Sequence, residues 1–138
     1  MKNEFVPYDI ALAMKELGFD EKCYGYYTEY KDYFYFDVDD LSSAYTKNMD
    51  NLIVNSVDDL ECTAPLYQQA FRWFREKYGL WFRPDYYDET RTDFSGSIHK
   101  LGRYSAIASI EECKSAEEAE LACLRKLIEI VNQNKEDE

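Results

Sequence analysis

The stretch CYGYYTEYKDYFYFDV at residues 23–38 decides which fold this chain can adopt. It contains two runs of tyrosine and phenylalanine, and the polar triplet Tyr30-Lys31-Asp32 separates them. Aromatic side chains suit the pleated, half-buried surface of a β-sheet. The stretch therefore predicts two antiparallel strands joined as a hairpin.

The residues just before this hairpin predict a helix at about residues 7–17. Pro7 suits the first turn, where its missing N–H is not needed, and Gly18 suits the left-handed position after the last turn. Phe19 follows, where it can fold back on the helix and complete a Schellman end. The apolar face of this helix has helical spacing and consists of Ile10, Ala13, Met14 and Leu17.

Two further helices are predicted from their own start and stop residues. Thr63 can N-cap the second helix, which has Pro65 in its first turn and Gly79 just past its end. Ser115 and Glu118 have the spacing of a capping box, so they can begin a third helix.

The segments between the helices predict short strands and one long loop. Residues 81–87 and 93–100 predict two strands, and a further short strand is expected near residues 104–110. Residues 39–61 lack a sustained period, which predicts a loop with one short strand at residues 52–54.

These elements define an α+β fold in a single domain. Their order is α-β-β-(loop)-α-β-β-α, with three helices and one antiparallel sheet of about four to five strands. The same order describes two α-β-β units followed by a closing helix. A chain of 138 residues needs only one core, so the domain is expected to span residues 1–131, and residues 132–138 are expected to form a charged tail that frays.

Acidic residues dominate the chain, whose formal charge is −12, and they concentrate in one part of it. Residues 20–61 hold eleven Asp and Glu against three Lys. A negative field of this kind repels phosphate backbones, so direct binding to nucleic acid is not expected, whereas a basic protein surface would be attracted. Charged residues also interrupt the apolar runs, which predicts neither a signal peptide nor a membrane span and indicates a cytoplasmic protein.

Three stretches resemble a family of small uncharacterised proteins found in gut Bacteroidales and in their bacteriophages and mobile elements. They are FVPYDIALAMKELGFDEKCYGYY at residues 5–27, APLYQQAFRWFREKYGLW at 64–81 and SAEEAELACLRKLIEIV at 115–131, in the same order along the chain. The family has no established activity and no assigned catalytic residues. The resemblance therefore implies only a context, the cytoplasm of a bacterial or phage-infected cell, and a fold built on the three helices.

Two groups of residues could carry catalytic or metal chemistry. Asp37 and Asp39 have i, i+2 spacing after a predicted strand, so their carboxylates could share Mg²⁺ or Ca²⁺ in a metal-dependent hydrolase. His99 is the only histidine and has Ser95 and Ser97 nearby, but no nucleophile motif surrounds it. The four cysteines lack a CxxC spacing and are expected to be reduced and partly buried. Because solvated strand residues are the commoner interpretation of both groups, we expect no enzymatic activity, no metal and no cofactor.

Residues 24–35 contain six tyrosines, the feature of the sequence that folding alone explains least well. If both faces of the sheet are covered, these tyrosines are simply part of the core and its rim. Exposed tyrosines provide large contact areas with little rotamer entropy, as interfaces and ligand pockets require. The leading hypothesis is therefore a small protein that binds a protein partner through an acidic, tyrosine-rich surface around residues 24–40. An alternative is a counter-defence protein that mimics nucleic acid by its charge or sequesters a nucleotide between aromatic rings, and an exposed aromatic sheet face would also favour a homodimer. The residues assigned to the binding surface are Tyr26, Tyr33, Tyr35, Asp37, Asp39 and Asp40.

Overall fold

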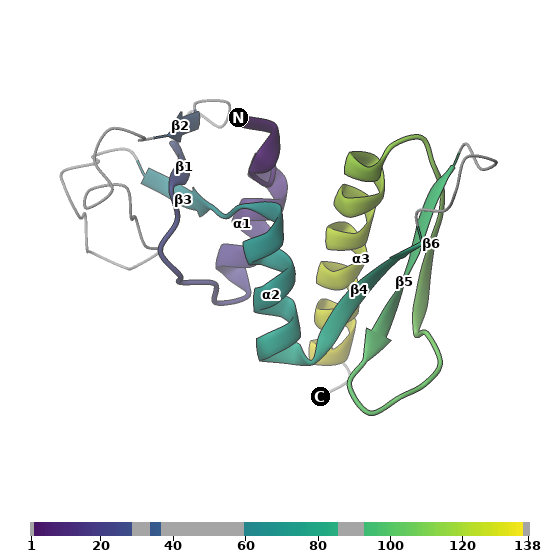
Figure 1. The fold of residues 1–138 in the computed structure, drawn as a ribbon. Helices are drawn as coiled ribbons and strands as arrows, with labels where there is room; N and C mark the ends of the chain where they lie inside the picture. The colour runs from purple at the N-terminus through teal and green to yellow at the C-terminus, as the bar shows by residue number, and fades with distance from the viewer. Residues whose placement is uncertain (1, 29–33, 37–59, 86–92, 137–138) are drawn as a thin grey trace. The chain divides into compact units, whose positions relative to one another are not determined.

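The computed structural model describes residues 2–28, 34–36, 60–85 and 93–136 (Figure 1). In chain order the elements are the 3-10 helix η1 (Lys2–Glu4), α1 (Tyr8–Glu16), β1 (Gly25–Thr28), β2 (Phe34–Phe36), β3 (Leu60–Ala64), α2 (Tyr67–Tyr78), β4 (Leu80–Asp85), β5 (Phe94–Lys100), β6 (Ala108–Cys113) and α3 (Ala116–Glu136). The predicted α+β class is confirmed. The described strands form two antiparallel three-stranded sheets, with the orders β2-β1-β3 and β4-β5-β6, where the sequence predicts one sheet.

The chain divides into two compact units, an N-terminal unit (Met1–Gln69) and a C-terminal unit (Ala70–Glu138). Each sheet belongs to one unit. In both units a helix precedes three strands, but the central strand is the first of the three in the N-terminal sheet and the second in the C-terminal sheet. The predicted likeness of the two halves therefore extends to element order and not to strand pairing.

The aromatic stretch at residues 23–38 contains the predicted hairpin. β1 pairs with β2 in antiparallel register, with Gly25 opposite Phe36 and Tyr26 opposite Tyr35. β1 is also the central strand of its sheet, because it pairs on its other edge with β3. The short strand predicted at residues 52–54 lies outside the described residues.

Strand β3 is the main element that sequence reasoning missed. Thr63, predicted as a helix N-cap, lies instead within β3, opposite Tyr26, and is completely buried. The residue before a proline is restricted to extended conformations, so Pro65 favours a strand ending at Ala64 as well as it favours a helix start. Helix α2 begins two residues after Pro65, at Tyr67.

Helix α1 ends in the predicted Schellman motif. The N–H of Phe19 donates to the carbonyl of Met14 at 2.9 Å, and the N–H of Gly18 donates to the carbonyl of Lys15 at 3.0 Å. Gly18 has a φ of 100°, a left-handed conformation that favours glycine because other residues have a Cβ atom. Phe19 is buried, which anchors this end of the helix in the core.

A buried tyrosine ties β1 to the N-terminal segment of the same unit. The hydroxyl of Tyr27 donates to the backbone carbonyl of Val6 at 2.8 Å, so this buried O–H has a hydrogen-bond partner. The ring of Tyr8 meets the ring of Tyr27 edge-on, with centroids 5.5 Å apart. Val6 in turn donates its N–H to the carbonyl of Pro65 at 3.0 Å.

In the C-terminal unit, α3 packs on strands β5 and β6 (Figure 1). The sheet contributes buried Leu80, Ile98 and Ile110 to this core. Successive residues of a strand point to opposite faces of a sheet. The neighbours of these three residues along each strand therefore lie on the face turned away from α3. The buried residues of α3 are Ala119, Cys123, Leu124, Leu127 and Val131, the apolar stripe of the helix.

The predicted capping box begins α3. The N–H of Glu118 donates to Ser115 Oγ at 3.1 Å, and Glu118 Oε2 accepts from the N–H of Lys114 at 3.0 Å. The helix continues to Glu136, beyond the predicted domain boundary at residue 131.

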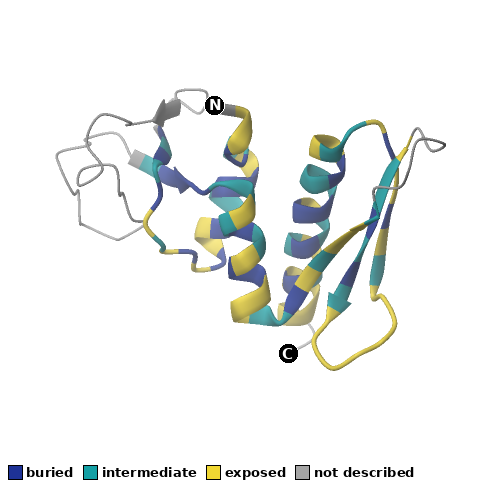
Figure 2. Ribbon diagram, viewed as in Figure 1, coloured by how far each residue is buried: buried dark blue, intermediate teal, exposed yellow. Residues whose placement is uncertain are grey.

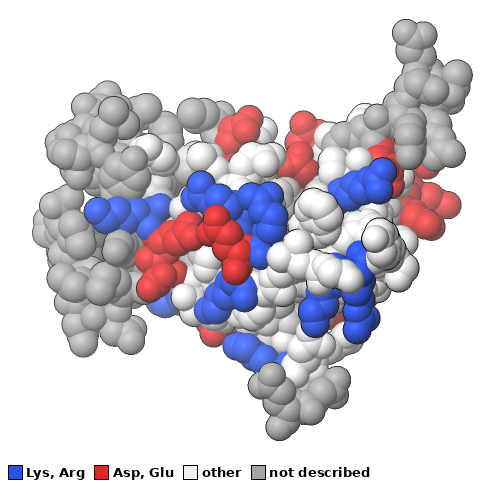
Figure 3. Space-filling view, turned by 60° about the horizontal axis from the view of Figure 1, so that its bottom comes forward, with Lys and Arg blue, Asp and Glu red and all other residues white. Residues whose placement is uncertain are grey.

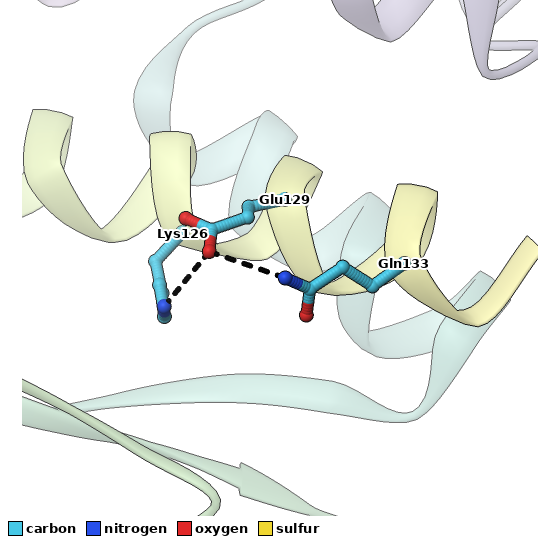
Figure 4. A network of polar contacts seen from close by, with 3 residues as sticks. All are labelled: Lys126, Glu129 and Gln133. Atoms are coloured by element: carbon cyan, nitrogen blue, oxygen red, sulfur yellow. Dashed lines mark hydrogen bonds and ion pairs between the residues drawn. The ribbon is translucent and has the colours of Figure 1, made fainter. Parts of the chain in front are cut away.

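The exposed side of α3 carries a short polar network (Figure 4). Glu129 Oε1 accepts from Lys126 Nζ at 3.1 Å and from Gln133 Nε2 at 3.4 Å. Such exposed pairs contribute little to stability, about 0–1 kcal/mol each. Within the described ranges, no helix combines the length and the apolar character that crossing a bilayer requires.

Candidate ligand-binding site

The structure describes few of the residues assigned to the acidic, tyrosine-rich surface. Tyr26 lies in β1 and is half-buried, and the backbone of Tyr35 lies opposite it in β2. Tyr33, Asp37, Asp39 and Asp40 lie outside the described residues. The acidic surface and the Asp37/Asp39 metal pair therefore stay predictions from the sequence.

A different candidate site lies on the C-terminal sheet, on the face turned away from α3. Trp81 is paired with His99, and Arg83 with Ser97, in the antiparallel register of β4 and β5. Directly opposite residues lie on the same face of a sheet, with Cβ atoms about 5 Å apart. Two neighbouring cross-strand pairs, called here rows, therefore bring an aromatic ring, a cation, an imidazole and a hydroxyl together on this face.

The loop between β5 and β6 extends this group of side chains. The loop is exposed along its length (Figure 2), and two backbone hydrogen bonds hold its start. Leu101 donates its N–H to the carbonyl of Gly79 at 2.9 Å, and Arg103 donates to the carbonyl of Lys100 at 3.1 Å. Gly102 has a φ of 88°, and this left-handed conformation permits the tight turn that brings Arg103 and Tyr104 beside the sheet.

The strand and loop residues together line an open pocket of about 510 Å³, called here the aromatic–cationic pocket. This volume falls in the range of small-molecule sites, roughly 300–1,000 Å³. The lining residues are Trp81, Phe82, Arg83, Pro84, His99, Arg103 and Tyr104.

Within the pocket, polar and aromatic contacts fix the orientation of two side chains. His99 Nε2 and Ser97 Oγ are hydrogen-bonded at 2.8 Å, which restrains the imidazole. The rings of Trp81 and His99 meet at 79° with centroids 6.3 Å apart. The indole remains 44% exposed and the side chain of Tyr104 is fully exposed, so both rings have surface available for stacking.

The pocket contains two arginines, whose guanidinium groups suit an anionic ligand. No ion pair with a described carboxylate involves Arg83 or Arg103. Their unit has eleven Lys and Arg against fourteen Asp and Glu, whereas the N-terminal unit has five against fourteen. Figure 3 shows one face of the molecule, on which Lys and Arg side chains border uncharged surface.

The cysteines are not prepared for nucleophilic chemistry. All four are free and buried. Burial raises the pKa of Cys23 and that of Cys62 to about 12, and raises the pKa of Cys123 further. These groups are therefore protonated thiols at neutral pH, the less reactive form. In the part of the chain that the structure describes, no cluster of three or more His, Cys, Asp or Glu side chains could hold a metal ion.

Of the residues that line this pocket, sequence reasoning considered only His99, with Ser95, Ser97 and the cysteines as possible partners, and the structure brings His99 together with Ser97. It missed Trp81, Arg83 and the loop residues. A signal for the strand residues was present in WFRPD at residues 81–85, because alternation places Trp81 and Arg83 on one face. Nothing local indicates that the loop at residues 101–107 returns to the same place.

Comparisons with protein-family models, with curated proteins and with solved structures find no match.

Proposed function

We propose that this chain is a binding protein whose aromatic–cationic pocket holds an organic ligand with an aromatic ring and an anionic group. The observation that carries the proposal is that an exposed indole and two guanidinium groups line one pocket, from Trp81, Arg83 and Arg103. Few ligands other than aromatic anions would use all three groups at once.

The two kinds of group contribute in different ways. Stacking of a flat ring on an aromatic side chain is worth about 1–3 kcal/mol, as measured for nucleic acid bases. A hydrogen bond between charged partners contributes about 1.5–3 kcal/mol more. One stack and one arginine contact would together give about 2.5–6 kcal/mol. Taken as a net binding free energy, this sum corresponds to dissociation constants from about 15 mM to about 40 μM, so we expect weak binding.

Ser97 and His99 are assigned to ligand recognition rather than to catalysis. Their hydrogen bond at 2.8 Å places a donor and an acceptor beside Trp81. A catalytic serine would also need a group that orients the imidazole and donors that stabilise the oxyanion. The pair can instead read hydroxyl or carbonyl groups at the edge of a stacked ring.

The proposal is tested with naphthalene-2-sulfonate, a flat aromatic anion. Binding is followed by isothermal titration calorimetry and by heteronuclear NMR, which records the chemical-shift changes of Trp81 and of neighbouring backbone amides. We expect saturable shifts confined to the pocket residues. Trp81→Ala should weaken binding about fivefold or more, because a stack worth about 1–3 kcal/mol is lost.

Arg75→Ala provides the matched control. Arg75 is exposed, belongs to the same unit and does not line the pocket. Its removal should leave the affinity for naphthalene-2-sulfonate unchanged. Equal weakening by Arg75→Ala and Arg83→Ala would show non-specific attraction, and shifts spread away from the pocket would refute the assignment of the site.

A further inference from the structure

We infer that the ligand of the aromatic–cationic pocket is a free nucleoside phosphate, an inference that rests on the proposed function. The chemistry of this class matches the pocket group by group. A nucleobase supplies the flat ring for Trp81 and a phosphate supplies the anion for the guanidinium groups. The sugar between them carries hydroxyls that a serine and a histidine can bind.

The spacing along β4 fits the distance between a base and its phosphate. Trp81 and Arg83 are alternate residues on one face, so they are about 6.8 Å apart along the strand. One sugar ring separates a base from its 5′-phosphate by a comparable length. A base stacked on Trp81 therefore places its phosphate beside Arg83, and Arg103 lines the same pocket from the loop.

The hydrogen-bonded pair lies beside this line. His99 is opposite Trp81 and Ser97 is opposite Arg83, so the pair occupies the neighbouring strand over the same two rows. Their mutual hydrogen bond at 2.8 Å holds the two side chains next to each other on this face. A sugar bridging the two rows would meet the Ser97 hydroxyl and the imidazole together.

The charge pattern favours a single nucleotide over a nucleic acid strand. Asp85 is the next residue of β4 on the same face, opposite Ser95 and about 6.8 Å beyond Arg83. Exposed Asp93 immediately precedes β5 at the same end of the sheet. A strand continuing past Arg83 would bring its next phosphate close to these carboxylates, within the Debye length of about 8 Å at physiological salt. The net charge of −12 opposes any long polyanion as well.

The experiment compares AMP with its parts. We expect AMP to bind at least about tenfold more tightly than adenosine and than ribose 5-phosphate, because each part lacks one of the two anchoring groups. Arg83→Ala should lower the affinity for AMP about tenfold or more and leave that for adenosine unchanged. Trp81→Ala should weaken both, and Arg75→Ala should weaken neither.

A 5′-phosphorylated oligodeoxyadenylate of ten nucleotides separates the free nucleotide from the end of a strand. It should bind more weakly than AMP at 150 mM salt. Asp85→Asn should raise its affinity several-fold and that of AMP by a smaller factor, because the oligonucleotide brings a second phosphate close to this carboxylate. Binding of the oligonucleotide as tight as that of AMP would overturn the choice of a free nucleotide.

The failures of the two proposals are distinguishable. If naphthalene-2-sulfonate binds in the pocket but AMP binds no better than adenosine, the nucleoside phosphate is refuted and the proposed function stands. If neither naphthalene-2-sulfonate nor AMP produces shifts at the pocket residues while the far-UV circular dichroism spectrum is that of a folded α+β protein, both are refuted.

Discussion

Replacement of Gly96 by alanine should destabilise the C-terminal unit, although alanine is normally the better residue inside a strand. A Cβ atom at this position would lie 2.3 Å from Phe82 Cε2 and 2.9 Å from the backbone oxygen of Arg83. Ordinary carbon contacts lie at about 3.5–4.0 Å, so the Phe82 ring would have to move by roughly 1 Å. The Arg83 oxygen belongs to the backbone of β4 and can yield only if the strand shifts.

The expected magnitude follows from three contributions. Overpacking of a methyl group costs about 1–3 kcal/mol. Displacement of Phe82 also disturbs its stacking on Phe71, where the centroids are 5.4 Å apart, and such pairs contribute about 0.5–1.5 kcal/mol. The lower backbone entropy of alanine in the unfolded chain returns about 0.5–1 kcal/mol. The net loss should therefore be about 1–3 kcal/mol, a decrease in Tm of roughly 3–12 °C for a chain of this size.

Urea and thermal unfolding followed by circular dichroism measure this loss, and a double-mutant cycle tests its cause. Phe82→Leu removes the ring that the new methyl group would strike, so Gly96→Ala should cost less in that background than in the wild type. The Arg83 oxygen remains, so relief should be partial. A Gly96→Ala variant as stable as the wild type, or additive costs in the double variant, would refute the packing argument.

Three further predictions concern other parts of the chain. Stability should fall as the pH rises above about 8.5, because Cys23 and Cys62 ionise near their ordinary pKa in the unfolded chain and only near 12 in the folded one. Each thiol should remove roughly 1.5–2 kcal/mol by pH 10, and a flat profile of unfolding free energy between pH 7 and 10 would contradict the burial of these thiols. Ser115→Ala should lower the unfolding free energy by about 1 kcal/mol, because the α3 cap is lost. Ser105→Ala changes an exposed loop residue of the same unit and should leave the unfolding free energy unchanged. Equal effects of the two replacements would argue against a capping role. If the acidic, tyrosine-rich surface binds proteins, the unchanged protein should capture a purified basic partner and the variant with Tyr33, Asp37 and Asp39 replaced by alanine should not. A folded variant that still captures the partner would eliminate that surface.

The elements that sequence reasoning predicted correctly depend on interactions between neighbours in the chain. The Schellman end at Gly18 and Phe19 and the capping box at Ser115 and Glu118 each use residues at most five positions apart. Their geometry is therefore decided locally, and their residue types are sufficient signals. The hairpin of β1 and β2 belongs to the same group, because its partners are near neighbours in sequence.

The error at Thr63 shows where this local information ends. A threonine two residues before Pro65 is compatible with a helix start and with a strand that ends at Ala64. Only pairing with β1, more than thirty residues earlier, selects the strand. The pairing of distant strands depends on the residues of both strands. The residues of β3 alone therefore do not determine that it pairs with β1.

The sequence by itself determined the α+β class, the helix boundaries marked by Gly18 and Ser115, and the aromatic hairpin, because each depends on residues that are close in the chain. Only the tertiary structure decided that the described strands form two sheets and that a pocket lies on the second. The pocket depends on the β4–β5 register, which sets Trp81 beside His99, and on the turn that returns Arg103 to them. Such convergence is a property of three-dimensional packing, since residues 81 and 103 have no local interaction that could bring them together.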